Sequence, residues 1–204
     1  MGMDNRLLVI FDMNGTLLYR ARHHPDKYSI DVPCTAIPAG KVRGRTVYLR
    51  PFLNDIFASD RFDYAFWTSA NEANANALSN FLPESSPQFI FNRDHCTENP
   101  NGEKAWSVFK DLDKIDKIKY GKFVLVDDTD EKLYRHHKHY HLHIPEYLCE
   151  EKDNVLHYFR LYLDILSDMD DYLKFMNNLT FDEYLEYSIE KPQQLNQLIL
   201  DKSC

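Results

Sequence analysis

The chain has 204 residues, of which 44% are hydrophobic and 14% aromatic, so it is long enough to bury the core of one domain with a small insertion. Its formal net charge of −8 excludes general electrostatic binding of nucleic acid, and any anionic ligand must be held by a local positive feature. The four cysteines are scattered without a CxxC pair, so they define neither a metal cluster nor a disulfide framework, and a reducing compartment is expected.

Residues 6–11 form the apolar run RLLVIF, which ends at Asp12. The run is too short for the hydrophobic region of a signal peptide or for a membrane span, and it predicts a strand buried on both faces of a parallel sheet. Gly2 suits myristoylation, but Arg6 stands where that motif needs Ser or Thr. No membrane insertion is therefore expected.

The segment FDMNGTLL at residues 11–18 follows this strand and carries the strongest motif. A carboxylate at a strand end, followed by glycine in a tight turn, can present an oxygen to phosphorus while backbone N–H groups hold the phosphate. Asp12 is therefore a candidate nucleophile. The alternative is a turn that only ends the strand, because Asn-Gly turns are common.

Residues 19–50 are rich in proline and glycine and predict a loop and hairpin beside the first strand, with residues 46–49 as a short strand. Three arginines flank the hairpin and could attract a phosphorylated peptide: Arg43, Arg45 and Arg50. The alternative is ordinary surface charge, and for Arg45 both interpretations stay open.

Residues 51–57 suit a helix with proline in its first turn, and residues 64–67 predict a second buried strand. That strand ends at Thr68-Ser69, and an alanine-rich helix follows through Leu78. The hydroxyl of Thr68 can donate to a phosphate oxygen, cap the helix, or do both.

A further short strand is expected at residues 89–91, and a third buried strand at 122–126 ends at Asp127-Asp128. Two adjacent carboxylates at a strand end are costly unless a cation compensates them, and Mg²⁺ suits oxygen ligands and a phosphate partner. Lys110 could offset charge on a transferring phosphate, with Lys104 as a rival, although either could be an ordinary surface lysine.

Three such strands separated by helical segments predict an α/β fold, in which ligands bind at the carboxyl ends of the parallel strands. Residues 151–178 have helical apolar spacing, and the tail beyond them is expected to be a helix followed by a loose end, broken at Pro192. The histidines of residues 136–143 suit the wet face of a strand better than a transition-metal site.

The same motifs, in this order, resemble those of the haloacid dehalogenase superfamily. The match is narrower for its small carboxy-terminal-domain phosphatases of RNA polymerase II, also called the NLI-interacting-factor-like family. The resemblance covers about residues 6–178 and includes LRPF at 49–52, FWTSA at 66–70, RDHC at 93–96, FKDL at 109–112, VDD at 126–128 and Ile144-Pro145.

This resemblance implies a Rossmann-like fold with a central parallel sheet, helices on both faces, a small β-hairpin insertion and no large cap. It implies a phosphatase-like domain over residues 1–178 and a C-terminal extension over 179–204. Its substrates would be phosphorylated proteins or peptides, with no direct nucleic-acid partner. The nucleus or cytoplasm is expected rather than the mitochondrion, and the sequence does not indicate the oligomeric state.

The resemblance also implies roles for individual residues. Asp12 would be the nucleophile that forms an aspartyl-phosphate, Thr68 and Lys110 would bind the phosphate, and Asp127 would orient Lys110. Mg²⁺ would be held by the Asp12 side chain, the backbone carbonyl of Asn14 and Asp128. Substrate contacts are expected from three further residues: Thr16, Ser69 and Arg50.

The chain departs from the family pattern DxDGT at Asn14. The missing carboxylate would protonate the leaving oxygen and then activate water, whereas an amide cannot relay a proton. One hypothesis is a slowed Ser/Thr phosphatase, and the other is a pseudophosphatase that binds a phosphoprotein or scaffold partner without turnover. An engineered Asp-to-Asn change is a third explanation.

Overall fold

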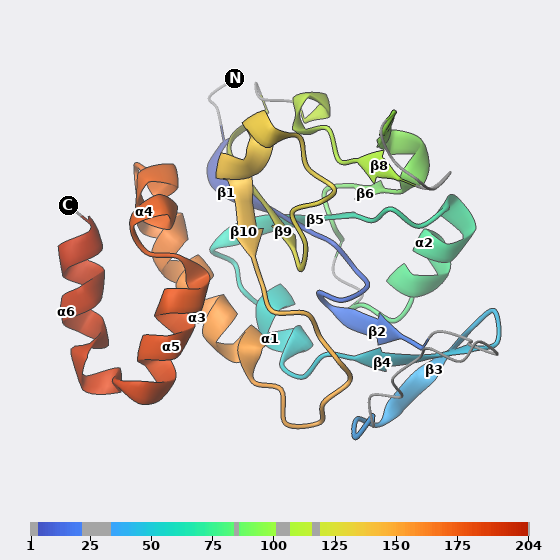
Figure 1. Cartoon of the computed structure of the whole chain (residues 1–204), viewed down its shortest axis with the longest axis horizontal. Helices are drawn as coiled ribbons and strands as arrows, with labels where there is room; N and C mark the ends of the chain where they lie inside the picture. The colour runs from blue at the N-terminus through green and yellow to red at the C-terminus, as the bar shows by residue number, and fades with distance from the viewer. Residues whose placement is uncertain (1–3, 22–33, 84–85, 101–106, 116–118, 204) are drawn as a thin grey trace.

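A computed structural model describes residues 4–21, 34–83, 86–100, 107–115 and 119–203 of the chain (Figure 1). Five parallel strands form the central sheet, in the order β10-β9-β1-β5-β6. They are β1 (Asp4–Phe11), β5 (Phe62–Trp67), β6 (Ile90–Phe91), β9 (Tyr120–Asp127) and β10 (His141–His143). This arrangement confirms the expected α/β fold with a central parallel sheet.

Strand β1 lies at the centre of the sheet because its side chains are apolar on both faces. Leu7, Val9 and Phe11 belong to one buried cluster, and Leu8 and Ile10 belong to another on the opposite face. A strand that is buried on both sides must be covered on both sides, which is what its continuous apolar sequence predicted.

Helices cover the first face of the sheet. Helix α3 (Val155–Asp168) contacts β5 and α1 (Leu53–Phe57), and all three contribute to the larger buried cluster. Helix α2 (Glu72–Ser79) follows β5, and its Leu78 joins the same cluster. The amphipathic spacing expected over residues 151–178 is thus the buried face of α3.

Shorter elements cover the second face of the sheet. Two 3-10 helices contribute to this side, η2 (Leu112–Lys114) through Leu112 and η3 (Arg135–Tyr140) through Tyr140. The strands β7 (Thr97–Glu98) and β8 (Val108–Phe109) form a separate antiparallel pair. Leu112 is fully buried against this face. A further 3-10 helix, η1 (Arg93–His95), follows β6.

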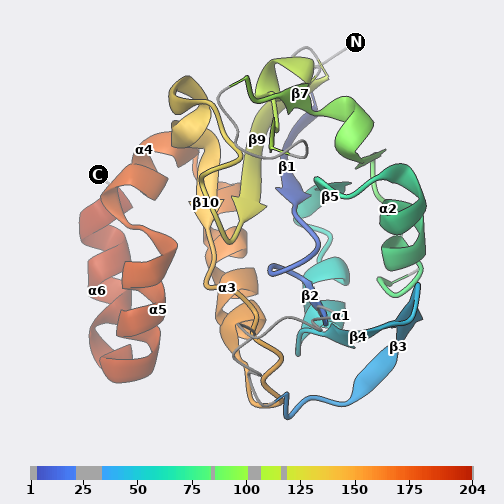
Figure 2. The same ribbon diagram turned by 45° about the vertical axis from the view of Figure 1, so that its right-hand side comes forward.

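The C-terminal segment is helical to Ser203, which corrects the expectation of a loose end. After α4 (Tyr172–Asn178), a capping box at Thr180 begins α5 (Phe181–Glu190). Pro192 begins α6 (Pro192–Ser203) instead of ending structure, since proline is tolerated in the first turn of a helix. Figures 1 and 2 show α4, α5 and α6 together at one end of the molecule, with the insertion at the other.

The insertion after β1 is a three-stranded antiparallel sheet in the order β2-β4-β3. Its strands are β2 (Leu18–Arg20), β3 (Pro38–Val42) and β4 (Arg45–Leu49). The turn between β3 and β4 has positive φ at Arg43 (49°) and Gly44 (78°), as hairpin turns of the primed types require. The expected hairpin is confirmed, and β2 adds a strand to it.

A disulfide joins Cys34 to Cys149, although the sequence indicated no pairing. The two cysteines are 115 residues apart in the sequence, so no local spacing could have revealed their contact. Backbone bonds link the same segments, because the N–H groups of Thr35 and Ala36 donate to the carbonyl oxygen of Cys149 at 3.1 and 3.2 Å.

No helix in the described part of the chain combines the length and the apolar composition that crossing a bilayer requires.

Candidate active site

The carboxyl ends of β1, β5 and β9 bring three predicted residues together. Asp12 follows β1, Thr68 follows β5 and Asp127 ends β9, and all three side chains are buried. The backbone N–H of Asp12 donates to the carbonyl of Val126 at 2.8 Å, which continues the pairing of β1 with β9. Parallel strands therefore place these side chains at one edge of the sheet, where ligands bind in α/β folds.

Lys110 is completely buried between two of these carboxylates. Its Nζ lies 2.8 Å from Oδ1 of Asp12 and 2.5 Å from Oδ2 of Asp127. Burial opposes ionisation of Asp127, but the ammonium groups of Lys110 and Lys132 outweigh it and hold the pKa of Asp127 below its ordinary value. The expectation that Asp127 contacts Lys110 agrees with this geometry. Lys104 lies outside the described residues.

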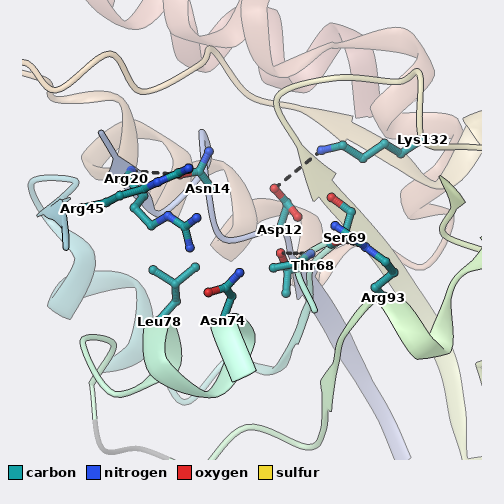
Figure 3. A pocket seen from close by; sticks show the side chains of 11 residues that line it. Asp12, Asn14, Arg20, Arg45, Thr68, Ser69, Asn74, Leu78, Arg93 and Lys132 are labelled. Atoms are coloured by element: carbon teal, nitrogen blue, oxygen red, sulfur yellow. Dashed lines mark hydrogen bonds and ion pairs between the residues drawn. The ribbon is translucent and has the colours of Figure 1, made fainter. Parts of the chain in front are cut away.

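Lys132 is a second cation at the site that sequence reasoning missed. Its Nζ lies 3.9 Å from Oδ2 of Asp12 (Figure 3) and 3.6 Å from Oδ1 of Asp127. The charge of Asp12 raises the pKa of Lys132 well above its ordinary value, against the effect of burial. The only sequence signal was its place in the loop that leaves β9, just beyond the two adjacent aspartates.

Asp128 completes an acidic group with Asp12 and Asp127, whose carboxylate oxygens lie within 4.8 Å of one another. Burial, together with the charges of Asp127 and Asp12, raises the pKa of Asp128 to about 6. These carboxylates repel one another and offer only oxygen atoms as ligands. A hard divalent cation suits such a site, because it binds oxygen and offsets the negative charge. Asp12 and Asp128 thus face a shared site, as the sequence predicted.

Gly15 is needed where the chain passes Asp128. Its φ is 95°, and a Cβ at this position would lie 2.7 Å from Oδ1 of Asp128. The neighbouring Thr16 is fully buried, and its hydroxyl donates to Oδ1 of Asp128 at 3.3 Å. Thr16 therefore positions Asp128 and does not line the pocket, which corrects its expected substrate contact.

Asn14 is exposed at the pocket, and its side chain has a defined orientation. Its Oδ1 accepts from the backbone N–H of Arg20 at 2.9 Å. A backbone N–H can only donate, so the oxygen of the amide is identified by this bond and the NH₂ group remains available as a donor. Asn14 can therefore bind an oxygen of a ligand, but it cannot act as an acid or a base.

Thr68 and Ser69 both line the pocket. Oγ1 of Thr68 accepts from the N–H of Ala70 at 3.2 Å, which leaves its hydroxyl hydrogen available to a phosphate oxygen. The side chain that caps α2 is Asn71, which accepts from the N–H of Asn74. The alternative in which Thr68 caps this helix is therefore wrong.

Arg50 takes a different place from the one expected. It is 1% exposed, and its guanidinium donates to the carboxylate of Asp153 at 3.0 and 3.2 Å and to the carbonyl of Thr16 at 3.0 Å. It does not line the pocket. Arg50 is thus a positioning residue that ties the motif after β1 to the start of α3, and the expectation of direct substrate contact is corrected.

The pocket over Asp12 has a volume of about 250 Å³ and is lined mainly by polar side chains. Among the described residues that line it, Asp12 is the only carboxylate, against four cations: Arg20, Arg45, Arg93 and Lys132. Of these, the sequence indicated only Arg45 as a candidate and placed Arg93 in a motif without a role. A pocket of this charge on a chain with a net charge of −8 favours an anionic ligand.

The histidines of residues 136–143 are divided between η3 and β10. His137 is buried, and its Nδ1 accepts from the N–H of Leu112 at 3.3 Å, so its Nε2 carries the proton and faces Asp113. His141 and His143 flank the buried Leu142, which confirms the alternation over β10. The bond to Leu112 disfavours metal ligation by His137.

Comparison with known proteins identifies a family whose model covers the residues of this site. The model of the NLI interacting factor-like phosphatases matches residues 7–173. A search of curated proteins found no match.

Two similar solved structures show how much of each chain is shared. One is Fcp1, an essential RNA polymerase II CTD phosphatase, with a TM-score of 0.47 and 13% identity over 70% of this chain and 42% of that one. The other is a variant of fission yeast Fcp1 bound to beryllium fluoride, with a TM-score of 0.44 and 11% identity over 97% of this chain and 62% of that one. This chain thus spans less than two thirds of either. By its match to the family model, it belongs to the NLI interacting factor-like phosphatase family.

Proposed function

We propose that the chain is a Mg²⁺-dependent protein Ser/Thr phosphatase that works through an aspartyl-phosphate on Asp12 and is slowed by Asn14. The observation that carries this proposal is the position of Asp12, a buried carboxylate at a strand end that faces a cation-lined pocket. The ammonium of Lys110 lies 2.8 Å from Oδ1 of Asp12, and the ammonium of Lys132 lies 3.9 Å from Oδ2.

The residues around Asp12 suit phosphoryl transfer. Lys110 orients the nucleophile, and the Thr68 hydroxyl and Lys132 can bind oxygens of the transferring group. Asp12, the Asn14 carbonyl and Asp128 would hold Mg²⁺, which when bound would neutralise charge on the phosphate. In the first step the carboxylate of Asp12 attacks phosphorus and the Ser or Thr oxygen leaves; in the second, water releases phosphate from Asp12.

Asn14 limits both steps, because no carboxylate is present there to protonate the leaving oxygen or to take a proton from water. General acid–base catalysis contributes about 10²–10⁴-fold, so a loss of this order is expected relative to a family member with aspartate. The NH₂ group of Asn14 can still donate to the leaving oxygen.

The test is hydrolysis of p-nitrophenyl phosphate with Mg²⁺ at mildly acidic pH by the native chain, Asn14→Asp and Asp12→Asn. We expect slow turnover by the native chain, a gain of at least about tenfold in Asn14→Asp, and none in Asp12→Asn. Equal rates in all three proteins would remove the phosphatase proposal.

The second candidate is a binding module without turnover. The orientation of Asn14 favours a binding module, because its NH₂ group is available to donate to a phosphate oxygen and such a bond supports binding without turnover. Turnover confined to Asn14→Asp, together with phosphopeptide binding by the native chain, would favour this alternative.

A further inference from the structure

Two arginines stand at the end of the pocket away from the nucleophile. Figure 3 shows Arg20 and Arg45 on the side of Asn14, above Leu78 of α2, whereas Thr68 and Lys132 lie on the side of Asp12. The pocket therefore has one end suited to the reacting phosphate and a second cationic end that the proposed reaction does not use.

The insertion sheet holds both arginines in place. Arg20 ends β2, where it pairs with Val47, and its N–H donates to the side chain of Asn14 at 2.9 Å. Arg45 begins β4 opposite Val42. The backbone of Arg20 is thus hydrogen-bonded to the residue two positions after the nucleophile, which keeps the start of the Arg20 side chain beside this motif.

Neither arginine has an anionic partner in the described part of the chain. The lysines at the catalytic end contact Asp12 and Asp127, but no carboxylate of the described residues lies within 4.0 Å of Arg20 or Arg45. Burial lowers the pKa of Arg20, and the nearby charges of Arg45 and Arg43 lower it further. An anion bound between the two guanidinium groups would relieve this repulsion, and guanidinium binds phosphate and carboxylate oxygens in bidentate geometry.

We propose that Arg20 and Arg45 form a second anion subsite, so that the preferred substrate is a phosphopeptide with another anionic side chain close to the phosphorylated residue. The inference rests on the proposed phosphatase function and specifies its substrate class. A second phosphate and a carboxylate offer the same chemistry to this subsite, and the experiment separates them.

A peptide suits the pocket better than an enclosed metabolite. At about 250 Å³ the pocket is smaller than the roughly 300–1,000 Å³ cavities that enclose a small molecule. The pocket is open to solvent and includes the exposed Asn14, so it can receive two side chains of a peptide whose backbone remains outside.

The test measures peptide binding by fluorescence anisotropy at fixed ionic strength. The ligands are serine-phosphorylated peptides whose neighbours within three positions on either side are neutral, contain one glutamate, or contain a second phosphoserine. The proteins are the native chain, the double variant Arg20→Gln/Arg45→Gln, and the matched control Arg43→Gln, which removes an exposed charge of the same hairpin outside the pocket.

We expect the native chain to bind at least one doubly anionic peptide about tenfold or more tightly than the neutral one, and the double variant to lose this preference, so that its affinity falls about tenfold more for the doubly anionic peptide than for the neutral one. The Arg43→Gln control should keep the preference. The glutamate and phosphoserine peptides show which anion the subsite takes. Circular dichroism melting checks that all variants are folded.

The inference is overturned if the native chain shows no preference, if the double variant weakens all peptides equally, or if ADP or a short RNA binds more tightly than every doubly anionic peptide. Binding of the neutral phosphopeptide, or turnover of p-nitrophenyl phosphate, together with any of these outcomes would leave the phosphatase proposal standing. Absence of both phosphopeptide binding and turnover would remove the two proposals together.

Discussion

At the scale of single residues, the site consists of charges that compensate one another. Lys110 is completely buried, and its ammonium group contacts the carboxylates of Asp12 and Asp127. A buried charge that loses its partner is costly, because the remaining group keeps its desolvation penalty without the attraction that offset it. The lysine therefore supports folding as well as the proposed chemistry.

Replacing Lys110 with methionine should lower the free energy of unfolding by about 3–5 kcal/mol, because it removes the cation in direct contact with two buried carboxylates and leaves them beside the more distant and partly exposed Lys132. Urea denaturation measures this change. Adding Asp127→Asn to Lys110→Met should recover part of the loss, since one of the carboxylates is then neutral. A single variant as stable as the native chain would contradict the buried triad.

The raised pKa of Asp128 predicts a pH dependence of stability in metal-free protein. Its pKa is about 6 in the folded state against 3.8 as the ordinary value, so between these values the folded chain binds more protons than the unfolded chain. The contribution of Asp128 to stability should therefore fall as the pH rises from about 4 to 6 and then level off. The lowered pKa values of His137 and His141 contribute a rise below pH 6.5, so the effect of Asp128 is measured as a difference from a variant that lacks it.

The variant Asp128→Asn should lack this fall and be more stable than the native chain at pH 7 without metal, by about 1 kcal/mol after allowance for the partial exposure of the group. Thermal melting in a chelating buffer across this pH range measures the difference. Mg²⁺ should stabilise the native chain and not the variant. Identical pH profiles for the two proteins would count against the shared acidic site.

At the scale of elements, apolar patterning predicted the sheet because β1, β5 and β9 are buried on both faces. The structure of the tail was harder to predict, since Pro192 is compatible with both a helix start and a break. Strand β2 is only three residues long, and its pairing with β4 depends on contacts between residues about 30 apart in the sequence. Local patterns do not contain that information.

The turn after β1 gives a prediction of its own. Gly15→Ala should weaken Mg²⁺ binding by tenfold or more, because the added Cβ would displace the carboxylate of Asp128 and the positive φ disfavours alanine. Gly121→Ala is the matched control, since a Cβ there meets no atom within 4 Å. Calorimetric Mg²⁺ titration compares the two, and equal affinities would contradict the close approach of this turn to Asp128.

At the scale of the whole molecule, the topology predicted where the strand-end residues meet, but not what surrounds them. Asp12, Thr68 and Asp127 converge because parallel strands end at one edge of the sheet. Arg20 and Lys132 reach the same pocket from the insertion and from the loop after β9. The course of those segments depends on tertiary packing. The burial of Arg50 was missed for the same reason, because its partner Asp153 is 103 residues away.

The central claim is that Asp12 accepts a phosphoryl group. Incubating the native chain with a phosphoserine peptide and Mg²⁺, quenching in acid and mapping the products by mass spectrometry tests it directly. We predict one phosphoryl group on the peptide that contains Asp12, labile to hydroxylamine, longer-lived in the native chain than in Asn14→Asp, and missing from Asp12→Asn. Dephosphorylation of the substrate with no such adduct, or with the phosphoryl group on another residue, would contradict the account.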